Sequence, residues 1–468
     1  MTKLVSALLI FAVGVSMSYA FADSNSSGFT NAISVNSAGE NATSPQMVVS
    51  GGNVYLGWIN NAANRSYVFF AKSTDGGSTF GKETDLGRIN SGSPDNLMIV
   101  ESQGKVYAVW QSFLSNKSSI VFTKSDDDGT TFEQPVQISD NSKDSAFPQI
   151  AVLENNVYFV WLDRTESDVT NIVFDKSDDG GTTFAGPVAI TNNNGNSGIP
   201  RISANGDSVY LMWEDNSKKN FDVYLNTSDD SGKTFGSPLD ISNSTGDSGA
   251  QQILVNGTNV YAVWMDNSPG NFDIYFSKST DGGKTFGKPL DVSSGKLDSG
   301  YPQFAVAGNE VYITWTEAVS PTNYDIFFAK STDGGKTFGT PLNISNSPGA
   351  SGWPQVAVDD NIYVNWVDNT PGHFDDYIAK SADDGKSFEA PVDVDNGSRT
   401  NSWYNSMSVL QGTVFLAWQQ GDNGGNDIMF AKSTTFVPEF GSIVPLVLVV
   451  SIVSIIAVSA RSSIRTRL

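Results

Sequence analysis

The sequence predicts an all-β protein in which eight four-stranded blades form one closed β-propeller. The first observation is a tryptophan that recurs every 51 or 52 residues, because a repeat period near 50 is typical of propellers. These tryptophans are Trp58, Trp110, Trp161, Trp213, Trp264, Trp315, Trp366 and Trp418. The second observation is that each repeat contains four short strand-like segments, which is the number in one propeller blade.

The third repeat illustrates the four segments. Residues 148–152 begin with a Pro-Gln pair, residues 157–161 end in a tryptophan, residues 172–176 lead into a turn, and residues 187–190 follow a proline. The second segment is apolar on both faces, as in Val-Tyr-Leu-Met-Trp at residues 209–213. A strand of this kind is covered on both sides. We therefore interpret the recurring tryptophans as core residues between blades and not as ligand platforms.

The two ends of the repeat array complement each other. Residues 29–35 form an additional strand-like segment before the first repeat, and the last repeat stops after its third segment, residues 427–432. We expect the N-terminal segment to complete the last blade, which closes the ring and removes its free edges. The ring would occupy residues 29–435 of a single domain, residues 23–436, and we expect a monomer.

A turn of the form Ser-x-Asp-x-Gly-x-Thr/Ser-Phe follows the third segment in seven repeats. Its aspartates are Asp75, Asp127, Asp179, Asp230, Asp281, Asp333 and Asp383. The aspartate can accept hydrogen bonds from backbone N–H groups of the turn, and the glycine permits positive φ. This motif resembles the Asp-box of the sialidase-type β-propellers, also known as the BNR repeat. The resemblance is specific for the fold and weak for the function, because Asp-boxes occur in proteins with different activities.

The two termini predict export and anchoring. Residues 1–22 have a lysine, an apolar stretch and a small-x-small site, as in a secretory signal peptide. Residues 443–460 are almost all apolar or small and are long enough for one transmembrane helix, and residues 461–468 carry three arginines. Because basic tails remain in the cytoplasm, the propeller is expected on the outer face of the cell membrane.

The linker before the apolar segment, residues 437–442, contains Val-Pro-Glu-Phe-Gly. Its Pro-Glu-Phe tripeptide is followed by an apolar segment and a short basic tail. This arrangement resembles the Pro-Glu-Phe type of C-terminal sorting signal of archaeal surface proteins. The resemblance implies that an archaeosortase cuts there and attaches the protein to a lipid. The alternative is a simple anchor that is not cleaved.

The composition excludes several functions. The formal net charge is −22, so no basic surface for nucleic acid is expected. Cysteine is absent, which excludes disulfides and thiol chemistry. No phosphate-binding loop and no His/Cys metal spacing occur, and we expect no cofactor. Sequons such as those at Asn41, Asn64, Asn116, Asn226 and Asn343 make glycosylation of the exported chain an expectation.

Acidic residues flank the loops that connect the second and third segments of several repeats. The pairs are Asp215 and Asp222, Asp266 and Asp273, Glu317 and Asp325, and Asp368 and Asp375. Such pairs can act as acid and base, bind Ca²⁺, or cap their own turns through backbone hydrogen bonds. The repetition favours turn capping, because a catalytic pair occurs once in a ring. Metal binding stays open.

Aromatic and polar residues are expected on the same face, at the start of the first strands. The aromatic residues, which suit either sugar stacking or packing, are Phe147, Tyr301, Trp353, Trp403 and Tyr404. The polar residues at equivalent positions are Gln46, Asp95, Gln149, Arg201, Gln252, Gln303, Gln355 and Asn405. The polar ring can satisfy backbone groups of the innermost strands. Arg201 differs from its counterparts and is the best candidate for contact with an anion.

The resemblance to sialidases implies three arginines that hold a substrate carboxylate, a Tyr–Glu pair and an aspartate. Residues 199–202, Ile-Pro-Arg-Ile, contain residue types of the family's first arginine motif in the wrong order. Neither a triad nor a nucleophile can be assigned, and the single histidine, His373, is interpreted as incidental. The sequence thus predicts no catalytic residues.

Three functions stay open. The favoured one is a surface-anchored module that binds a cell-surface glycan or protein. Its ligand-binding residues would be Arg201, Trp353, Trp403, Gln149, Gln303 and Gln355. The alternatives are an exo-acting glycoside hydrolase of the sialidase type with a divergent site, and a purely structural envelope component.

Overall fold

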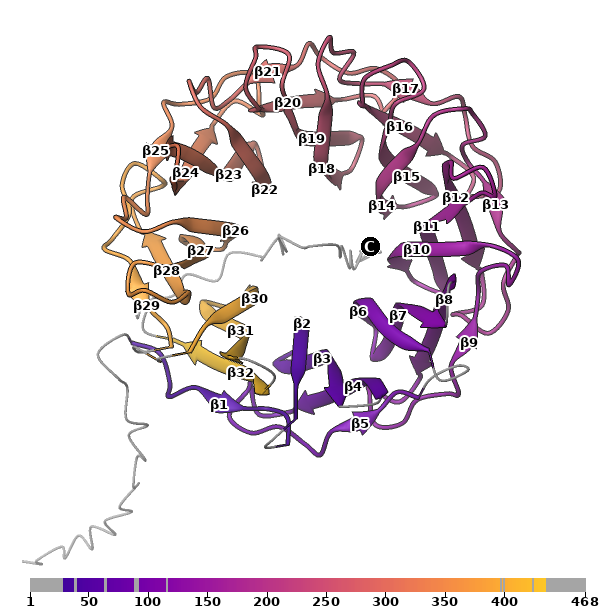
Figure 1. Ribbon diagram of the computed structural model, residues 1–468, viewed down its shortest axis with the longest axis horizontal. Coiled ribbons are helices and arrows are strands. Elements are labelled where there is room, and N and C mark those ends of the chain that lie inside the picture. Colours follow the sequence, from indigo (N-terminus) through magenta and orange to yellow (C-terminus); the bar gives the residue numbers. More distant parts are fainter. Residues whose placement is uncertain are drawn as a thin grey trace, which may run out of the picture.

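The computed structural model of the chain describes residues 28–37, 40–62, 65–87, 92–114, 117–395, 398, 400–422 and 425–434. These residues form eight four-stranded antiparallel sheets arranged as blades around a central axis (Figure 1). The prediction of an all-β, eight-bladed propeller is confirmed. No helix in this part of the chain could cross a membrane. The expected signal peptide, sorting motif, transmembrane helix and basic tail lie outside the described residues.

Each blade runs from an innermost first strand to an outermost fourth strand (Figure 1). The first strands of blades 1 to 8 are β2 (Ala42–Ser50), β6 (Ser93–Ser102), β10 (Asp144–Leu153), β14 (Ser197–Asn205), β18 (Ser248–Asn256), β22 (Ser299–Ala307), β26 (Ser351–Val358) and β30 (Ser402–Leu410). The second strands are β3 (Asn53–Ala62), β7 (Lys105–Leu114), β11 (Asn156–Arg164), β15 (Ser208–Asp215), β19 (Asn259–Asp266), β23 (Glu310–Ser320), β27 (Ile362–Asp368) and β31 (Thr413–Asp422).

The third strands are β4 (Arg65–Ser73), β8 (Lys117–Ser125), β12 (Thr170–Ser177), β16 (Asp222–Ser228), β20 (Asp273–Ser279), β24 (Asn323–Ser331), β28 (Asp375–Ser381) and β32 (Gly425–Ser433). The fourth strands have two residues each. They are β5 (Thr84–Asp85), β9 (Val136–Gln137), β13 (Val188–Ala189), β17 (Leu239–Asp240), β21 (Leu290–Asp291), β25 (Leu342–Asn343), β29 (Val392–Asp393) and, in blade 8, β1 (Ile33–Ser34).

The N-terminal strand closes the ring as predicted. β1 pairs antiparallel with β32, with Ile33 opposite Phe430. Backbone hydrogen bonds extend the pairing on both sides, from Thr30 N to Lys432 O at 2.9 Å and from Val35 N to Ile428 O at 2.8 Å. Blade 8 is therefore assembled from both ends of the ring, and its outer edge is covered.

The core lies between neighbouring blades. All eight recurring tryptophans are at most 1% exposed, which confirms their interpretation as core residues. Tyr261 and Val263 of β19, for example, pack in one cluster with Ile313 and Trp315 of β23. Because each second strand contributes to clusters on both of its sides, its apolar pattern on two faces follows from the architecture.

The Asp-boxes form hydrogen-bonded turns between the third and fourth strands. In blade 5, Asp281 Oδ1 accepts hydrogen bonds from Ser279 Oγ at 2.7 Å and Thr285 N at 2.9 Å. Its Oδ2 accepts from Thr285 Oγ1 at 2.6 Å, and Ser279 Oγ accepts from Gly283 N at 2.9 Å. These bonds lower the pKa of Asp281 to about 2. The predicted capping role of the aspartate is confirmed.

Each Asp-box also joins its blade to the preceding one. Phe338, at the end of the motif in blade 6, lies edge-on to Phe276 of β20, with ring centroids 5.1 Å apart. Gly335 of the same turn has φ +86°, and a Cβ atom there would lie 2.3 Å from the Phe276 ring. The motif therefore needs glycine both for its backbone conformation and for the close approach of the neighbouring blade.

Candidate functional site

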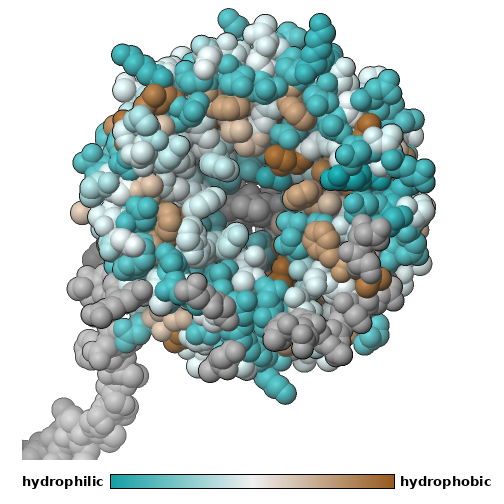
Figure 2. Space-filling model, in the orientation of Figure 1, coloured by the Kyte–Doolittle hydropathy of each residue, from teal (hydrophilic) through white to brown (hydrophobic). Residues whose placement is uncertain are grey.

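Two sets of loops form one face of the ring, which we name the loop face. They connect the second to the third strand within a blade and the fourth strand to the first strand of the next blade. The Asp-boxes follow the opposite ends of the third strands and therefore lie on the other face. The ring surrounds a central hollow, and several hydrophobic side chains border that hollow on the otherwise mostly hydrophilic surface in Figure 2.

Every first strand has a β-bulge where it reaches the loop face. In blade 7, Gly352 pairs with Val367 and Gln355 pairs with Asn365, so two residues lie opposite Trp366 alone. The first of these two residues has φ between 44° and 55° in every blade, although none is glycine. We name these eight residues the display ring; they are Ser44, Asn96, Phe147, Ile199, Ala250, Tyr301, Trp353 and Tyr404. A left-handed conformation costs a non-glycine residue on the order of 1–3 kcal/mol.

The aromatic side chains of the display ring are exposed at the bulge. Phe147, Tyr301, Trp353 and Tyr404 are 52%, 60%, 51% and 64% exposed. Three of these aromatic residues belong to the consecutive blades 6, 7 and 8. The sequence identified the aromatic residues but not their conformation, because a residue before proline normally prefers an extended backbone.

Three aromatic side chains form a cluster between blades 7 and 8. Trp353 lies edge-on to Trp403 with ring centroids 5.7 Å apart, and Phe374 lies 4.3 Å from Trp403 and 6.4 Å from Trp353. Phe374 belongs to the loop before β28, and its N–H donates to Asn401 Oδ1 at 3.0 Å. We name Trp353, Phe374 and Trp403 the aromatic cluster. Phe374 was not predicted from the sequence, because Phe221, Phe272 and Tyr324 stand at the equivalent position of blades 4, 5 and 6 and nothing in the repeat marks Phe374 as different.

The predicted polar ring is partly confirmed. Gln149, Gln303 and Gln355 occupy the same position, opposite the residue that precedes the tryptophan of the second strand. Gln355 Nε2 donates to Asn405 O at 2.6 Å, and its Oε1 accepts from Met407 N at 2.8 Å. Gln355 therefore satisfies backbone groups of the next blade, which is the role that the sequence suggested for the polar ring.

Two members of the predicted polar ring were wrong. The position in blade 2 is held by Met98 and not by Asp95, and in blade 8 it is held by Ser406 and not by Asn405. These two blades have no proline before the position, so the sequence contains no marker of the bulge there. Asn405 occupies the position that is proline in blades 1, 3, 4, 6 and 7.

Arg201 of β14 is partly buried and hydrogen-bonded within the protein. Its Nε donates to Gln252 Oε1 at 3.3 Å, and its Nη1 donates to Pro200 O at 3.2 Å. Burial lowers the pKa of Arg201 to about 10 and raises that of the neighbouring Glu214 to about 7, an effect that Arg201 opposes. β14 lies across the ring from β26, so the structure separates Arg201 from Trp353 and Trp403 (Figure 1).

The acid pairs of the loops mostly cap turns. Asp215 accepts hydrogen bonds from Ser217 N at 2.9 Å and Ser197 Oγ at 2.8 Å, and Asp266 has the equivalent partners in blade 5. The turn-capping interpretation is therefore confirmed for these two aspartates. Asp375 differs: it is fully buried, and neither of its carboxylate oxygens accepts a hydrogen bond from a described residue. His373 Nε2 lies 3.1 Å from Asp375 Oδ1.

The described arginine side chains do not form the cluster that a sialidase requires. Arg164 is exposed and pairs with Asp168 at 2.8 Å, whereas Arg201 is partly buried. The side chains of Arg65, Arg88 and Arg399 lie outside the described part of the structure.

One of the predicted sequons can be excluded as a glycosylation site in the folded ring, because Asn226 is buried in β16. Asn343 at the outer edge of blade 6 is exposed.

Grooves bounded by described residues lie on the flanks of the ring. The groove between blades 3 and 4 has a volume of about 580 Å³ and is lined by Phe174, Asp175, Val188 and Phe235, among others. Burial raises the pKa of Asp175 to about 6. The candidate site is the exposed aromatic surface of the loop face.

The closed ring and its hydrogen-bonded Asp-boxes define an eight-bladed Asp-box β-propeller. No protein-family model and no curated protein sequence matches the chain. Similar solved structures include an ulvan lyase of polysaccharide lyase family PL25, with a TM-score of 0.49 and 12% identity over 78% of this chain and 96% of that chain.

Two sialidases are also similar in structure. A Hadza microbial sialidase has a TM-score of 0.39 and 16% identity over 59% of this chain and 63% of that chain. A Trypanosoma rangeli sialidase in complex with sialic acid has a TM-score of 0.40 and 14% identity over 76% of this chain and 56% of that chain. The chain thus spans less than two thirds of the length of either sialidase. At these TM-scores and identities, the function has to be argued from the site.

Proposed function

We propose that the protein is an exported, membrane-anchored β-propeller that binds an extended glycan on its loop face. The observation that carries this proposal is the aromatic cluster between blades 7 and 8, next to the exposed display-ring residues Tyr301 and Tyr404. Large aromatic side chains that remain half exposed leave apolar surface in water, which is typical of a binding surface. Their faces suit the C–H groups of sugar rings, and the tyrosine hydroxyl groups can hydrogen-bond to sugar hydroxyl groups.

The arrangement favours a chain of several sugars over one terminal sugar. Tyr301, Trp353 and Tyr404 have the same backbone conformation in three consecutive blades, so they form an arc along the rim of the hollow. An extended ligand can contact several rings of the arc at once, and each contact then adds to the affinity.

A binding role without hydrolysis is supported by the burial of the aspartates in the acid pairs. Glycoside hydrolysis requires two carboxyl groups that reach the scissile bond. Asp215, Asp266, Asp325, Asp368 and Asp375 are all at most 3% exposed. These carboxylates stabilise the loops and cannot contact a bound sugar without a rearrangement of the loop face.

One observation supports the alternative of a glycoside hydrolase. Burial raises the pKa of Glu214 to about 7, and a general acid needs a raised pKa of this kind. The backbone N–H of Ala250 lowers the pKa of Glu214, which indicates a structural role at the bulge of blade 5. Hydrolysis of fluorogenic sialosides or of other glycosides by the purified protein, lost in Glu214→Gln or Arg201→Ala, would favour the enzyme.

A glycan array probed with the purified protein tests the binding proposal. We expect binding to oligosaccharides, followed by calorimetric confirmation with the best ligand, and weaker binding to the corresponding monosaccharide. An array without any bound glycan, together with binding of a surface protein from the same cells, would favour the protein-ligand alternative.

Anchoring is tested separately. Protease added to intact cells should cleave the propeller and leave the basic C-terminal tail intact. Intact-mass analysis of the mature protein distinguishes the two kinds of anchor, because archaeosortase processing near Pro438 removes the apolar segment and a simple anchor retains it.

A further inference from the structure

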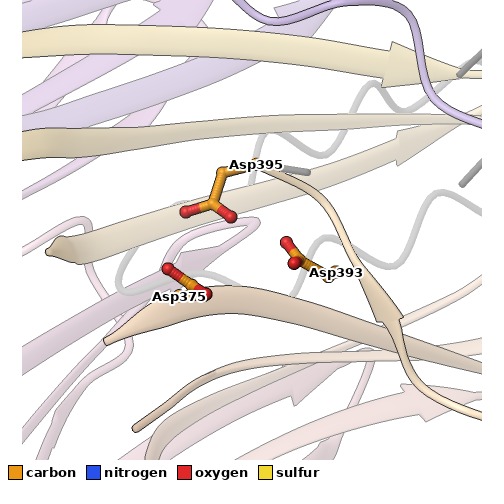
Figure 3. A group of neighbouring side chains, drawn as sticks. All are labelled: Asp375, Asp393 and Asp395. Carbon is orange, nitrogen blue, oxygen red and sulfur yellow. The ribbon is translucent and has the colours of Figure 1, made fainter. Parts of the chain in front are cut away.

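Blade 7 contains a group of three carboxylates that is not repeated among the described residues of the other blades. Asp375 begins β28, Asp393 ends β29, and Asp395 follows two residues later. One oxygen of each carboxylate lies within 4.8 Å of the others. Figure 3 shows the three side chains directed toward one another from two segments of the blade.

In other blades, the aspartate at the position of Asp375 accepts hydrogen bonds from the segment that follows the fourth strand. In blade 5, Asp273 Oδ1 accepts hydrogen bonds from Ser293 Oγ and from Gly295 N, both at 3.2 Å. Asp222 in blade 4 is bonded by Ser242 Oγ and Ser244 N in the same way. The backbone pairing that precedes each serine is repeated by Val394 N and Asp376 O, so Asp395 takes the place of the serine in blade 7. A hydroxyl donor is thus replaced by a third carboxylate.

The replacement leaves a buried carboxylate without donors. Asp375 is 0% exposed, and neither of its oxygens accepts a hydrogen bond from the described residues. His373 Nε2, 3.1 Å from Oδ1, is oriented so that no hydrogen bond forms, and it can supply at most one positive charge. An ionised carboxylate buried without donors is strongly destabilising unless a cation compensates it. The unpartnered oxygens are directed into the group in Figure 3.

Asp395 is held in place by the following strand. Its Oδ2 accepts a hydrogen bond from Ser402 Oγ at 2.6 Å, while its Oδ1 has no hydrogen-bond donor among the described residues. Because one oxygen of each carboxylate lies within 4.8 Å of the others, all three can be ionised together only with a positive charge between them.

We propose that Asp375, Asp393 and Asp395 bind one Ca²⁺ ion. All three ligands are hard oxygen donors, and Ca²⁺ accepts several carboxylates together with backbone oxygens and water in a flexible geometry. Mg²⁺ requires a stricter octahedron and keeps most of its waters, and Zn²⁺ prefers nitrogen and sulfur ligands. Three negative charges match a divalent cation better than the single protonated imidazole of His373.

The site would also organise the aromatic cluster. Asp375 directly follows Phe374, and Asp395 is bonded to Ser402, which directly precedes Trp403. An ion that joins these carboxylates would fix the two segments that carry two of the three aromatic rings. This second step rests on the proposed glycan binding, whereas binding of the ion does not.

Calcium binding is tested on the purified protein after treatment with EDTA. Titration with Ca²⁺ in a calorimeter should show one ion per chain, and about 1 mM Ca²⁺ should raise the melting temperature because the ion binds only the folded ring. Absence of both effects would overturn the proposal. A response to Zn²⁺ without one to Ca²⁺ would overturn the identity of the ion.

The decisive variant is Asp395→Ser, which introduces the serine found at the equivalent position of blades 2, 4, 5 and 6. Its hydroxyl can donate to Asp375, so the variant should fold, melt in EDTA at or above the temperature of the unchanged protein, and bind Ca²⁺ more than about tenfold more weakly. The matched control is Asp291→Asn in blade 5, at the position equivalent to Asp393, which should leave the calcium response intact. Equal calcium responses of the Asp395→Ser variant and the unchanged protein would show that this group is not the site.

Glycan binding measured with Ca²⁺ and with EDTA separates the two proposals. If the unchanged protein binds Ca²⁺ but no glycan, the ion site stands and the proposed function fails. If glycan binding falls in EDTA and in Asp395→Ser but not in Asp291→Asn, the ion also positions the aromatic cluster.

Discussion

Phe430 of β32 lies edge-on to Phe80 of the first Asp-box, with ring centroids 5.0 Å apart, so the last blade packs against the first. The same contact occurs inside the ring, for example between Phe174 and Phe235 at 4.8 Å. Lys432 adds to the closing junction, since its Nζ donates to Gly76 O at 2.6 Å. The junction between the two ends of the ring is therefore built like the junctions between consecutive blades.

Ring closure gives the first prediction. Removal of residues 28–36 eliminates β1 and exposes the edge of β32, so we expect a loss of several kcal/mol in the free energy of unfolding. Phe430→Ala should cost about 3–5 kcal/mol, as for other buried phenylalanines. Denaturant unfolding measures both, with Phe174→Ala as the matched control at an internal junction. An unchanged melting temperature after removal of β1 would contradict closure by this strand.

The Asp-boxes predict how stability depends on acid. Hydrogen bonds from serine and threonine lower the pKa values of Asp127, Asp281 and Asp383 to about 2. An unfolded aspartate titrates near pH 3.9. The folded ring thus gains stability from these groups above about pH 4 and loses it as the pH falls toward 2.

Unfolding by urea between pH 5 and pH 2.5 checks this dependence. Asp281→Asn cannot titrate and should show a shallower decrease in the free energy of unfolding than the unchanged protein. Asp291→Asn, on the adjacent fourth strand of the same blade, should retain the full decrease. Equal slopes for all three proteins would contradict the role of the Asp-box carboxylates.

The aromatic cluster predicts which residues carry binding. Trp353→Ala should weaken the binding of an oligosaccharide by roughly 1–2 kcal/mol, because a half-exposed indole is removed from the surface that the ligand covers. The melting temperature should change little, because Trp353 is 51% exposed.

Phe147→Ala is the matched control for Trp353→Ala. Phe147 has the same bulge conformation and a similar exposed fraction, 52%, but belongs to blade 3. Its substitution should leave the affinity unchanged in calorimetric titrations. Equal losses in both variants would mean that the ligand spans the whole display ring, and no loss in either would place the site elsewhere.

Glu214 should make the free energy of unfolding depend on pH in the direction opposite to that of the Asp-box aspartates. Its pKa of about 7 in the folded protein exceeds the value near 4.3 of an unfolded glutamate. Between these values the folded protein holds a proton that the unfolded chain has lost, so the free energy of unfolding falls as the pH rises from about 4.3 to 7. Glu214→Gln should remove this decrease and therefore raise the free energy of unfolding above pH 7.

Arg201→Ala tests the same pair from the other side. Arg201 opposes the effect of burial on Glu214, so its loss should raise the pKa of Glu214 further and lower the stability above pH 7. The double variant with Glu214→Gln should restore that stability. If Arg201→Ala instead weakens glycan binding at unchanged stability, the guanidinium group contacts the ligand directly.

The fold could be predicted from the sequence because the same local signals recur in each repeat. The tryptophan fixes the second strand, the Asp-box fixes the turn after the third, and the proline before Gln149, Gln303 or Gln355 marks the first strand. The closing strand was predictable from the incomplete last repeat. The polar-ring position was predicted wrongly in blades 2 and 8, where it is held by Met98 and Ser406 and no proline precedes it.

The site was less predictable because it depends on departures from the repeat and on contacts between blades. Trp353 and Trp403 were identifiable as extra tryptophans, but only the fold brings Phe374 against them. Asp395 follows β29 and takes the place of a serine such as Ser293 in blade 5. This replacement becomes visible only when the blades are superimposed. Arg201 was recognised as unusual, yet its hydrogen bonds to Gln252 and Pro200 depend on the bulge.

The display ring allows recognition to change without a change of fold. Its eight positions share one backbone conformation, while the side chains range from Ser44 and Ala250 to Trp353. A substitution at such a position alters the surface presented at the hollow but neither the strand ladder nor the core between blades. The ring is therefore a scaffold with eight interchangeable contact points, on which new specificities can be produced by diversifying a few codons.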